Sequence, residues 1–466
     1  MGERDAVTDA FWLPALEPAD HDGFEERAFG AFRARVPRLK PDGVRRLAEE
    51  LGRAREASLA QRPIAEIVDA VARAAAALAD PDGPLRARCV ELLPAITGYS
   101  REMIRHGLDR MAEDWRADAL RSALAAELGD PLVLDCPRPH PRGAPGLVRA
   151  FGPRLVAHVF SGNVPGVSVT SLVRATLTKA ASFGKTASGE PLTAVAFAHA
   201  LDSVDPALAR CIAVTHWPGG SEPLERALFE SADAVIAYGS DASVDAVRRV
   251  APAGTPLIAH PHRIGVALVA REALARAGPA LAEAAARDVS VFDQQGCVAP
   301  HAIYVEADAA AAAVFAERLA AAMQTIADEW PRRDVSAAEA ARIHETRAAM
   351  EFRGARVWSS PRGTAWTVIL DTDPALTPSP LNRVVFVKPV ADLAAALDAL
   401  APRRAWLQSV GLAADAPRFE ALAERLGGLG ASRVVALGRM SWPEPHGHPD
   451  GRFQFQDLLR FVDVLP

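Results

Sequence analysis

The sequence predicts an α/β protein with two doubly wound α/β domains, in which parallel strands alternate with helices. Two regions support this prediction. From residue 155 to about 260, short strand-like runs alternate with amphipathic helices, and a second alternation runs from residue 262 towards the C-terminus. The chain of 466 residues is also too long for one ordinary hydrophobic core. We therefore expect two sheet-based domains with smaller accessory elements.

The first 131 residues predict a helical region that packs on the cofactor domain. Apolar residues recur at three- and four-residue steps in "GVRRLAEELGRAREASLA", "PIAEIVDAVARAAAALA" and "EMIRHGLDRMAEDWRADALRSALAAEL". We expect helices over residues 24–127, and Asp130-Pro131 ends the last of them.

Residues 132–152 predict a β-hairpin, because the β-like runs 132–134 and 146–150 flank a connector rich in Pro, Gly and His. Residues 446–466 contain alternating apolar side chains and predict an edge strand.

Residues 153–259 predict a dinucleotide-binding domain. Its expected strands are "LVAHVF", "ASFGKTA", "CIAVTHW", "AVIAYG" and "PLIAHP". Residues 260–445 predict the second, catalytic domain, with expected strands "HRIGVALV", "HAIYVE", "AWTVILD", "RVVFVKPV" and "RVVALG".

Composition excludes several classes of function. The net charge is −6 and arginines alternate with acidic residues, which argues against nucleic-acid binding. The four cysteines are scattered without metal spacing, and "HPHRIG" offers only two histidines, so we expect neither a metal nor a disulfide framework. No apolar run of membrane length and no signal-peptide pattern occurs, so a cytoplasmic protein is expected.

The stretch "FSGNVPG" follows a predicted buried strand, where ligands of parallel sheets bind. Ser161 and Gly162 let the backbone turn sharply. Asn163 can present its side-chain amide to a developing oxyanion. The alternative is that Asn163 only caps the next helix.

Two further turns suit a dinucleotide. Lys185, followed by Thr186 and Ser188, can meet phosphate or ribose hydroxyls, although a solvated turn lysine is an equal alternative. Gly239 and Ser240 precede a helix whose N-terminal N–H groups suit a pyrophosphate, and Ser240 is also an ordinary N-cap.

Cys297 in "DQQGCVAP" is the candidate nucleophile. A polar turn opened by a glycine favours the reactive thiolate, whereas a buried structural cysteine is the alternative. Cys89 and Cys211 lie in apolar runs typical of packing cysteines, and Cys136 fits either role.

The order of these features resembles the aldehyde dehydrogenase superfamily. More closely, "FSGNVPG", "SFGKTASGEPL", "VIAYGS", "DQQGC", "LQSVG" and "SRVVALGRM" resemble the acyl-CoA reductase family, which is LuxC-like and includes the fatty-acid reductase subunit of bacterial bioluminescence. The resemblance covers residue 130 to the C-terminus. It implies an aldehyde-dehydrogenase-like fold in which the 132–152 hairpin and the C-terminal strand form an oligomerisation arm.

The resemblance also implies roles for single residues. Cys297 stands where the family has its acyl-accepting nucleophile, and Asn163 where the superfamily has its oxyanion amide. The implied cofactor set consists of Ser161, Gly162, Lys185, Thr186, Ser188, Gly239 and Ser240.

Two departures from the superfamily pattern bear on the reaction. The water-activating glutamate is missing, because the equivalent region reads "LIAHPHRIGVALV". Acyl transfer to or from a thiol carrier is therefore favoured over hydrolysis. The motif that holds the nicotinamide ribose is replaced near "PSPLNRVVFVKPV", which leaves that contact open.

We accordingly expect NADPH-dependent reduction of an acyl-CoA or acyl-carrier thioester to the aldehyde. Ser188 replaces a glutamate that would repel the 2′-phosphate, which permits NADPH, with NADH as the alternative. The alternative functions are NAD(P)-dependent aldehyde oxidation to the free acid and a non-catalytic nucleotide-binding subunit. We also expect a homo-oligomer and a partner acyl-transfer enzyme.

Overall fold

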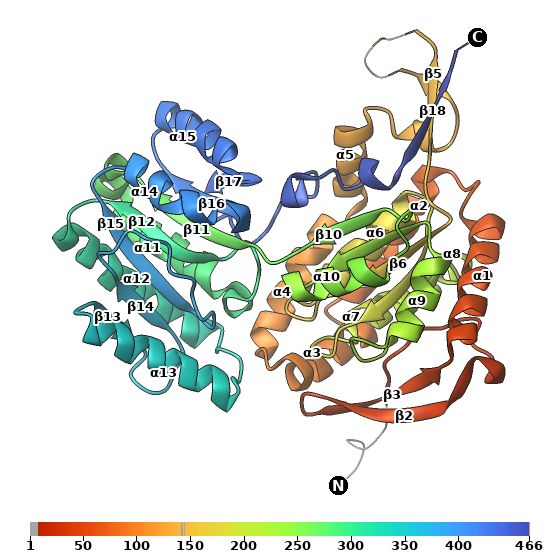
Figure 1. Ribbon diagram of the computed structural model, residues 1–466, viewed down its shortest axis with the longest axis horizontal. Coiled ribbons are helices and arrows are strands. Elements are labelled where there is room, and N and C mark those ends of the chain that lie inside the picture. Colours follow the sequence, from red (N-terminus) through yellow and green to blue (C-terminus); the bar gives the residue numbers. More distant parts are fainter. Residues whose placement is uncertain (1–7, 141–142, 144, 466) are drawn as a thin grey trace. The chain divides into compact units, whose positions relative to one another are not determined.

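The computed structural model describes residues 8–140, 143 and 145–465, and the chain forms two compact units (Figure 1). Unit 1 comprises Met1–Thr97, Ile104–Pro261 and Glu444–Pro466. Unit 2 comprises Gly98–Met103 and His262–Pro443. Each unit has its own sheet and its own hydrophobic core.

Unit 1 contains a five-stranded parallel sheet, as expected, in the order β10-β9-β6-β7-β8. Its strands are β6 (Leu155–Val159), β7 (Ala181–Thr186), β8 (Ile212–His216), β9 (Ala234–Tyr238) and β10 (Leu257–His260). The connecting helices are α6 (Val167–Leu177), α7 (Thr193–Val204), α8 (Pro206–Ala209), α9 (Glu222–Ser231) and α10 (Asp241–Val250). The strand order reverses between β6 and β9, which is where ligands bind in open parallel sheets.

The N-terminal region contains the expected helices but begins with strands. The helices are α1 (Pro41–Ser58), α2 (Ile64–Ala79), α3 (Pro84–Thr97), α4 (Arg101–Asp114) and α5 (Ala117–Leu128). The strands are β1 (Thr8–Asp9), β2 (His21–Phe29) and β3 (Phe32–Leu39). The prediction of helix from residue 24 was therefore wrong for residues 24–39.

The physical reason for the β2–β3 hairpin lies in its turn and its alternation. Side chains along β2 alternate between more and less exposed, the period of a strand. Gly30 turns the chain with φ of 59°, a conformation that favours glycine. A Cβ at Gly30 would lie only 2.4 Å from the Ala95 carbonyl oxygen, so the turn also packs closely on α3.

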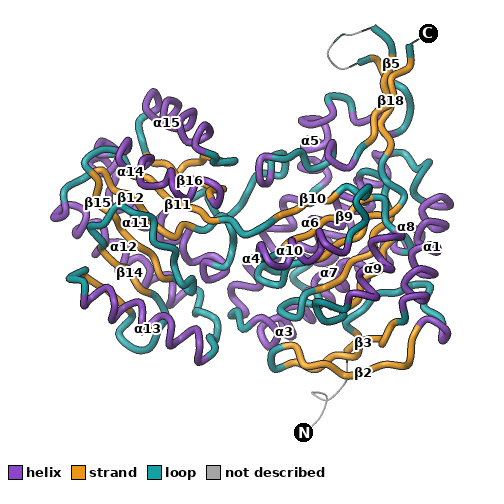
Figure 2. The backbone as a smooth tube through the Cα atoms, in the orientation of Figure 1, coloured by secondary structure: helices purple, strands orange, loops and turns teal. Residues whose placement is uncertain are grey.

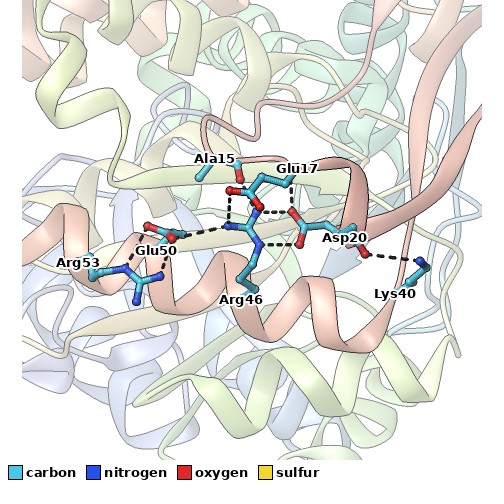
Figure 3. Close-up of polar contacts among 8 residues, drawn as sticks. Ala15, Glu17, Asp20, Lys40, Arg46, Glu50 and Arg53 are labelled. Atoms are coloured by element: carbon cyan, nitrogen blue, oxygen red, sulfur yellow. Dashed lines mark hydrogen bonds and ion pairs between the residues drawn. The ribbon is translucent and has the colours of Figure 1, made fainter.

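Polar contacts fix the segment before this hairpin to α1 (Figure 3). Arg46 on α1 donates from Nε to Asp20 Oδ1 at 2.6 Å and also pairs with Asp20 Oδ2. Burial opposes ionisation of Asp20, but the hydrogen bonds from Arg46 and the Glu17 backbone hold its pKa below the ordinary value. Asp20 also closes the short 3-10 helix η1 (Pro18–Asp20) through a capping box with Glu17. This cluster is therefore structural.

The predicted hairpin near residue 140 exists with shifted strands. β4 (Arg138–Pro139) and β18 (Arg460–Val464) both pair antiparallel with β5 (Leu147–Phe151), and Figure 2 shows the β5 and β18 strands side by side. Residues 132–134 lie instead in the 3-10 helix η2 (Pro131–Leu134), because the Asp130 side chain accepts from the Leu132 N–H at 3.0 Å and caps it. Residues 141, 142 and 144 of the predicted hairpin lie outside the described residues.

Unit 2 contains a seven-stranded sheet in the order β13-β14-β15-β12-β11-β16-β17, parallel except for β13. The strands are β11 (Ile264–Val269), β12 (Pro300–Glu306), β13 (Arg356–Ser359), β14 (Thr367–Leu370), β15 (Val384–Val390), β16 (Leu407–Ala413) and β17 (Arg433–Ala436). The helices are α11 (Arg271–Ser290), α12 (Ala309–Glu329), α13 (Ala337–Phe352), α14 (Leu393–Leu400) and α15 (Ala416–Leu429).

Strands β13 and β16 and helix α13 were not predicted from the sequence. Strand β16 is buried along its whole length between β11 and β17, so it shows no alternation of polar and apolar residues. Its sequence "LQSVGLA" also mixes Gln, Ser and Gly into the strand. Across the described part of the chain, none of the helices combines the length and the apolar character that a membrane span requires.

Candidate active site

The carboxyl edge of the unit 1 sheet gathers the predicted cofactor residues. Strand β6 lies between β7 and β9, and Val159 at its end is in register with Lys185 and with Ala237. The turn after β6 therefore lies between the turn after β7 and the turn that carries Gly239 after β9. Three segments far apart in the sequence meet at one edge of the sheet.

Two of these turns pack directly on each other. A Cβ at Gly162 would lie 3.0 Å from Ala187 Cβ, from Glu190 N and from Gly189 Cα, so only a residue without a side chain fits. Glu190 is buried and accepts from Leu192 N at 2.9 Å and from Thr193 N at 2.8 Å. Its carboxylate thus caps α7 and fixes the turn from residue 187 to 190.

Asn163 is exposed on the β6 turn. Helix α6 has Gly166, not Asn163, at its N-cap, so the capping alternative was wrong. A Cβ at Gly166 would lie 2.0 Å from Met111 Sδ, and its φ is 94°, so glycine is required there.

Lys185, Thr186 and Ser188, at and just after the end of β7, differ in burial. Lys185 is mostly buried, and burial lowers its pKa, with the Glu225 carboxylate opposing that shift. The Thr186 side chain is buried and its hydroxyl donates to the Thr215 carbonyl at 3.3 Å, so a contact between Thr186 and the cofactor stays a prediction. Ser188 is exposed in the turn beyond them.

Gly239 and Ser240 connect β9 to α10. The Ser240 hydroxyl accepts from Ser243 N at 3.2 Å, so Ser240 is the N-cap of α10. It is also exposed, at a helix start whose dipole favours an anionic group. Ser240 is therefore both the N-cap of α10 and part of the turn proposed to bind the pyrophosphate.

His260 ends β10 at the same edge of the sheet. Its Nδ1 donates to Asp450 Oδ2 at 2.6 Å, and its ring stacks on Tyr238 with centroids 4.5 Å apart. His260 lies in the region where the superfamily pattern has a glutamate. Its contact with Asp450 attaches the C-terminal segment to this end of β10.

In unit 2, Cys297 lies on an exposed turn between two buried elements. The turn follows the short helix η3 (Val291–Gln294) and precedes β12. Cys297 is exposed, whereas burial raises the pKa of Cys89 and of Cys211 to about 12. Accessibility therefore separates Cys297 from the two packing cysteines, as predicted. Cys136 is exposed as well.

The backbone before Cys297 is strained. Phe292, Asp293 and Gln294 have φ of 46°, 51° and 66°, the left-handed region that costs roughly 1–2 kcal/mol per non-glycine residue. From the other side, β11 approaches closely: a Cβ at Gly265 would lie 2.4 Å from the Val298 carbonyl oxygen. Such strain persists only where surrounding contacts enforce it, and it is concentrated at functional sites.

Those contacts come from the segment before β15. The Asp293 carboxylate pairs with the Arg383 guanidinium at 2.7 Å, and the Gln294 amide bonds the Val384 backbone. The Gln295 amide donates to Asn382 Oδ1 at 3.2 Å. These partners were not predicted from the sequence. The one signal in the sequence is the unusual "PSPLNRVV" stretch, which was interpreted only as a missing ribose motif.

A second segment, 438–441, is attached to the helix that leads to the turn. Asp288 on α11 accepts from Gly438 N and, at 3.0 Å, from Met440 N. Burial raises the pKa of Asp288 to about 6, although these backbone N–H groups act in the opposite direction. Met440 in turn packs on Gly411, where a Cβ would lie 2.5 Å from its sulfur. The "LQSVG" and "SRVVALGRM" stretches are thus packing partners beside α11.

Cys297 belongs to unit 2, and Asn163 with the cofactor residues belongs to unit 1. The meeting of Cys297 and Asn163 across one substrate therefore stays a prediction.

Known proteins resemble this chain in sequence as well as in fold. The family model for acyl-CoA reductase (LuxC) matches residues 59–461. A long-chain acyl-protein thioester reductase of Aliivibrio fischeri is 26% identical over 379 residues, which cover 79% of this chain and 76% of the relative. The protein of the same description from Photorhabdus luminescens is 30% identical over 217 residues, which cover 44% of this chain and 43% of the relative.

Solved structures share the fold at lower identity. An NADP-dependent glyceraldehyde-3-phosphate dehydrogenase from Bacillus halodurans, complexed with NADP, superposes with a TM-score of 0.72 at 15% identity, covering 98% of both chains. An NAD-dependent benzaldehyde dehydrogenase from Corynebacterium glutamicum gives 0.70 at 18% identity, covering 95% of both chains. The fold is that of the aldehyde dehydrogenases.

Proposed function

The chain belongs to the acyl-CoA reductase (LuxC) family, so it is an oxidoreductase that reduces an acyl thioester to the aldehyde, and we propose that Cys297 carries the acyl group and that NADPH is the reductant. The observation that supports this most is the exposed Cys297 on a strained turn held by buried polar contacts. The family model confirms the resemblance to the acyl-CoA reductase family that was seen in the sequence.

In the proposed mechanism the Cys297 thiolate attacks the thioester carbonyl carbon. The carbonyl π electrons move to oxygen, and the Asn163 amide and the Cys297 backbone N–H donate to that oxyanion, each worth about 3 kcal/mol in comparable sites. The oxyanion collapses, the carrier thiolate leaves, and the acyl group remains on Cys297 as a thioester.

A nicotinamide cofactor, when bound, would supply a hydride. The carbonyl carbon on Cys297 gains that hydride and becomes a thiohemiacetal oxyanion, which the same donors stabilise. Collapse of this oxyanion breaks the carbon–sulfur bond, releases the aldehyde and returns Cys297 to its thiolate. One pair of donors therefore serves both half-reactions.

The residues on the unit 1 edge fit a dinucleotide. Gly162 lets the turn after β6 pack on the 187–190 turn, Ser240 starts α10 with an exposed side chain, and Ser188 adds no negative charge beside Lys185. Lys185 and Ser188 would meet the adenosine ribose and its 2′-phosphate, Gly239 and Ser240 the pyrophosphate, and Ser161 and Gly162 the adjoining backbone.

The proposed acyl donor rests on the relatives. Two of them are described as long-chain acyl-protein thioester reductases, which supports a long-chain acyl group on CoA or on a protein, including a partner acyl-transfer enzyme. We also propose that the chain works as a homo-oligomer through the β4–β5–β18 arm. Its aliphatic side chains Leu147 and Val464 are in register and both exposed.

A single assay tests the proposal. Purified protein is incubated with NADPH and acyl-CoAs of increasing chain length, and absorbance loss is followed together with trapping of the aldehyde. We expect aldehyde formation that is lost in Cys297→Ala, whereas Cys136→Ala, the matched exposed cysteine, retains it. NADPH binding should persist in Cys297→Ala because the cofactor residues lie in unit 1.

The alternatives give different results. Rapid conversion of aldehyde to free acid with NADP+ and without CoA would favour an oxidising dehydrogenase. Nucleotide binding without turnover, and equal iodoacetamide labelling of Cys297 and Cys136, would favour a non-catalytic subunit.

A further inference from the structure

We propose that Asp293, Gln294 and Arg383 form a positioning unit, a set of buried side chains that holds the Cys297 turn in its reactive geometry. None of the three is placed in contact with substrate. The inference deepens the proposed function and rests on it, because it assigns to these residues the orientation of the nucleophile used there.

The Gln294 side chain closes the Cys297 turn. Its Nε2 donates to the Pro300 carbonyl at 2.7 Å, which lies at the far end of the turn, and to the Val384 carbonyl at 3.0 Å. Its Oε1 accepts from Val384 N at 3.1 Å and from Ser379 Oγ at 3.3 Å. The side chain is fully buried, and both of its donors and its acceptor oxygen are used. One amide therefore fixes the residues on both sides of Cys297 to the segment before β15.

The second component is an ion pair with no access to solvent. Asp293 Oδ1 accepts from Arg383 Nε at 2.7 Å, and the two side chains are 1% and 0% exposed. Asp293 Oδ2 accepts from Arg333 N, and Arg383 Nη2 donates to the Trp330 carbonyl, each at 2.9 Å. The pair thus connects the Cys297 turn to the segment after α12 as well.

Both partners of the pair lie on strained backbone. Phe292, Asp293 and Gln294 are left-handed, and so are Leu381, Asn382 and Arg383, with φ between 56° and 65° for this second group. Two non-glycine left-handed stretches meet through the Asp293–Arg383 and Gln294–Val384 contacts. Local sequence preference does not favour either stretch, so the contacts between them must maintain both.

The pair is not arranged for stability alone. Within the described residues, Arg383 Nη1 is buried without a hydrogen-bond acceptor. A buried charge that keeps an unsatisfied donor contributes less stability than apolar packing of the same volume. The ion pair lies beside the Cys297 turn and maintains strained backbone. This indicates that it shapes the Cys297 turn.

Contacts from the start of α4 support the same turn on another side. Tyr99 Oη donates to the Phe292 carbonyl at 3.2 Å, and Phe292 N donates to Met103 Sδ at 3.4 Å. Side chains therefore satisfy both backbone polar groups of the left-handed Phe292. We assign the orientation of the residues that lead to Cys297 to Asp293 and Gln294.

The test compares Asp293→Asn and Arg383→Lys with a matched control. Lys388→Met with Asp371→Asn removes another buried ion pair of unit 2, in which Lys388 Nζ and Asp371 Oδ2 are 2.5 Å apart. For each variant, the thermal midpoint, the iodoacetamide rate at Cys297, kcat and the KM for NADPH are measured. We expect Asp293→Asn and Arg383→Lys to lower kcat and the alkylation rate at least tenfold with an unchanged KM. The control variant should lose stability only.

A second variant covers the case in which those proteins do not fold. Gln294→Glu keeps the acceptor for Val384 N but loses both donors, to Pro300 and to Val384, and protonation of the new carboxyl restores one of the two. Its alkylation rate relative to the unchanged protein should rise as pH falls from 8 to 6. A merely structural residue would not give such a pH profile.

The outcomes separate the inference from the function. If Asp293→Asn is folded and its Cys297 is alkylated at the original rate, or if the control slows both reactions equally, the positioning role is refuted. If the unaltered protein reduces no thioester, the proposed function fails instead, and the alkylation rates still decide whether the three residues shape the turn.

Discussion

Reactivity at the residue scale depends on what surrounds each thiol and each turn. Cys297 is exposed beside Gly296 and polar side chains, whereas burial suppresses ionisation of Cys89 and Cys211. The same contrast applies to cofactor residues: Ser188 is exposed, while Thr186, two positions earlier, uses its hydroxyl to bond Thr215. Thr186 is the last residue of β7 and is buried in the sheet, whereas Ser188 lies in the turn that follows the strand.

Ser188→Glu should reverse the proposed preference for NADPH. A carboxylate there would repel the 2′-phosphate, and two charges near a protein surface interact by about 1–4 kcal/mol at 4 Å. We expect the ratio of kcat/KM for NADPH over NADH to fall about tenfold, which corresponds to ~1.4 kcal/mol. Ser122→Glu, the same change at an exposed position on α5, serves as the control. An unchanged ratio would place the 2′-phosphate elsewhere.

Single residues could be predicted where the information is local. The turns that carry Asn163 and Gly239-Ser240 were predicted correctly because strand, turn and helix follow one another within a dozen residues. The partners Gln294–Val384 and Asp293–Arg383 lie 90 positions apart in the sequence, and no local pattern reveals such a pairing. No local pattern separates Thr186 from Ser188, because the burial of Thr186 depends on the neighbouring strand β8.

Among the elements, the arm formed by β4, β5 and β18 has one buried face and one exposed apolar face. Val148 and Ala150 of β5 are buried, so one face of this small sheet packs on unit 1. Leu147, Phe151 and Val464 occupy the opposite face and are exposed. Apolar side chains gathered on one strand pair favour contact with a further protein surface.

Leu147→Asp should therefore weaken the proposed homo-oligomer. A carboxylate opposite Val464 would oppose burial of this face against a second copy. Light scattering after size exclusion should show a smaller species than the unaltered protein. Val314→Asp on α12 changes another exposed aliphatic side chain and should leave the mass unchanged. Equal masses for all three proteins would contradict the arm as an oligomer contact.

The predicted strands of both sheets were correct wherever β-branched residues were concentrated. Two elements were missed for opposite reasons. Strand β16 lacks alternation because both its faces are buried, and the β2–β3 hairpin has alternation that was taken for helical periodicity in an Arg- and Glu-rich stretch. The Gly30 turn was the available signal for the hairpin.

For the whole molecule, buried neutral histidines set the response to acid. Burial lowers the pKa of His158 to about 3, and the pKa values of His216 and His301 to about 4. In the unfolded chain each ring takes up a proton below about pH 6.5. Their contribution is therefore fully present above pH 6.5 and is lost as pH falls towards 4, by about 1.4 kcal/mol per pH unit for each ring.

His158→Gln should reduce this acid sensitivity. The His158 ring lies within hydrogen-bonding distance of Ser171 Oγ and Ser182 Oγ at 2.9 and 3.2 Å, contacts that a glutamine amide can partly replace. Between pH 6.5 and 5 the free energy of unfolding in urea should fall by about 2 kcal/mol less than in the unaltered protein. His446→Gln, at a ring that is not buried, is the control. Parallel pH profiles for all three proteins would contradict the prediction.

The division of the chain has a consequence for synthesis. Gly98–Met103 belongs to unit 2 although it precedes most of unit 1 in the sequence, and Tyr99 and Met103 bind the backbone of Phe292. A fragment that starts at His262 would lack both side chains. Without Gly98–Met103, the unit that carries Cys297 would lack these two contacts to the Phe292 backbone, which join a segment synthesised early to a turn synthesised much later.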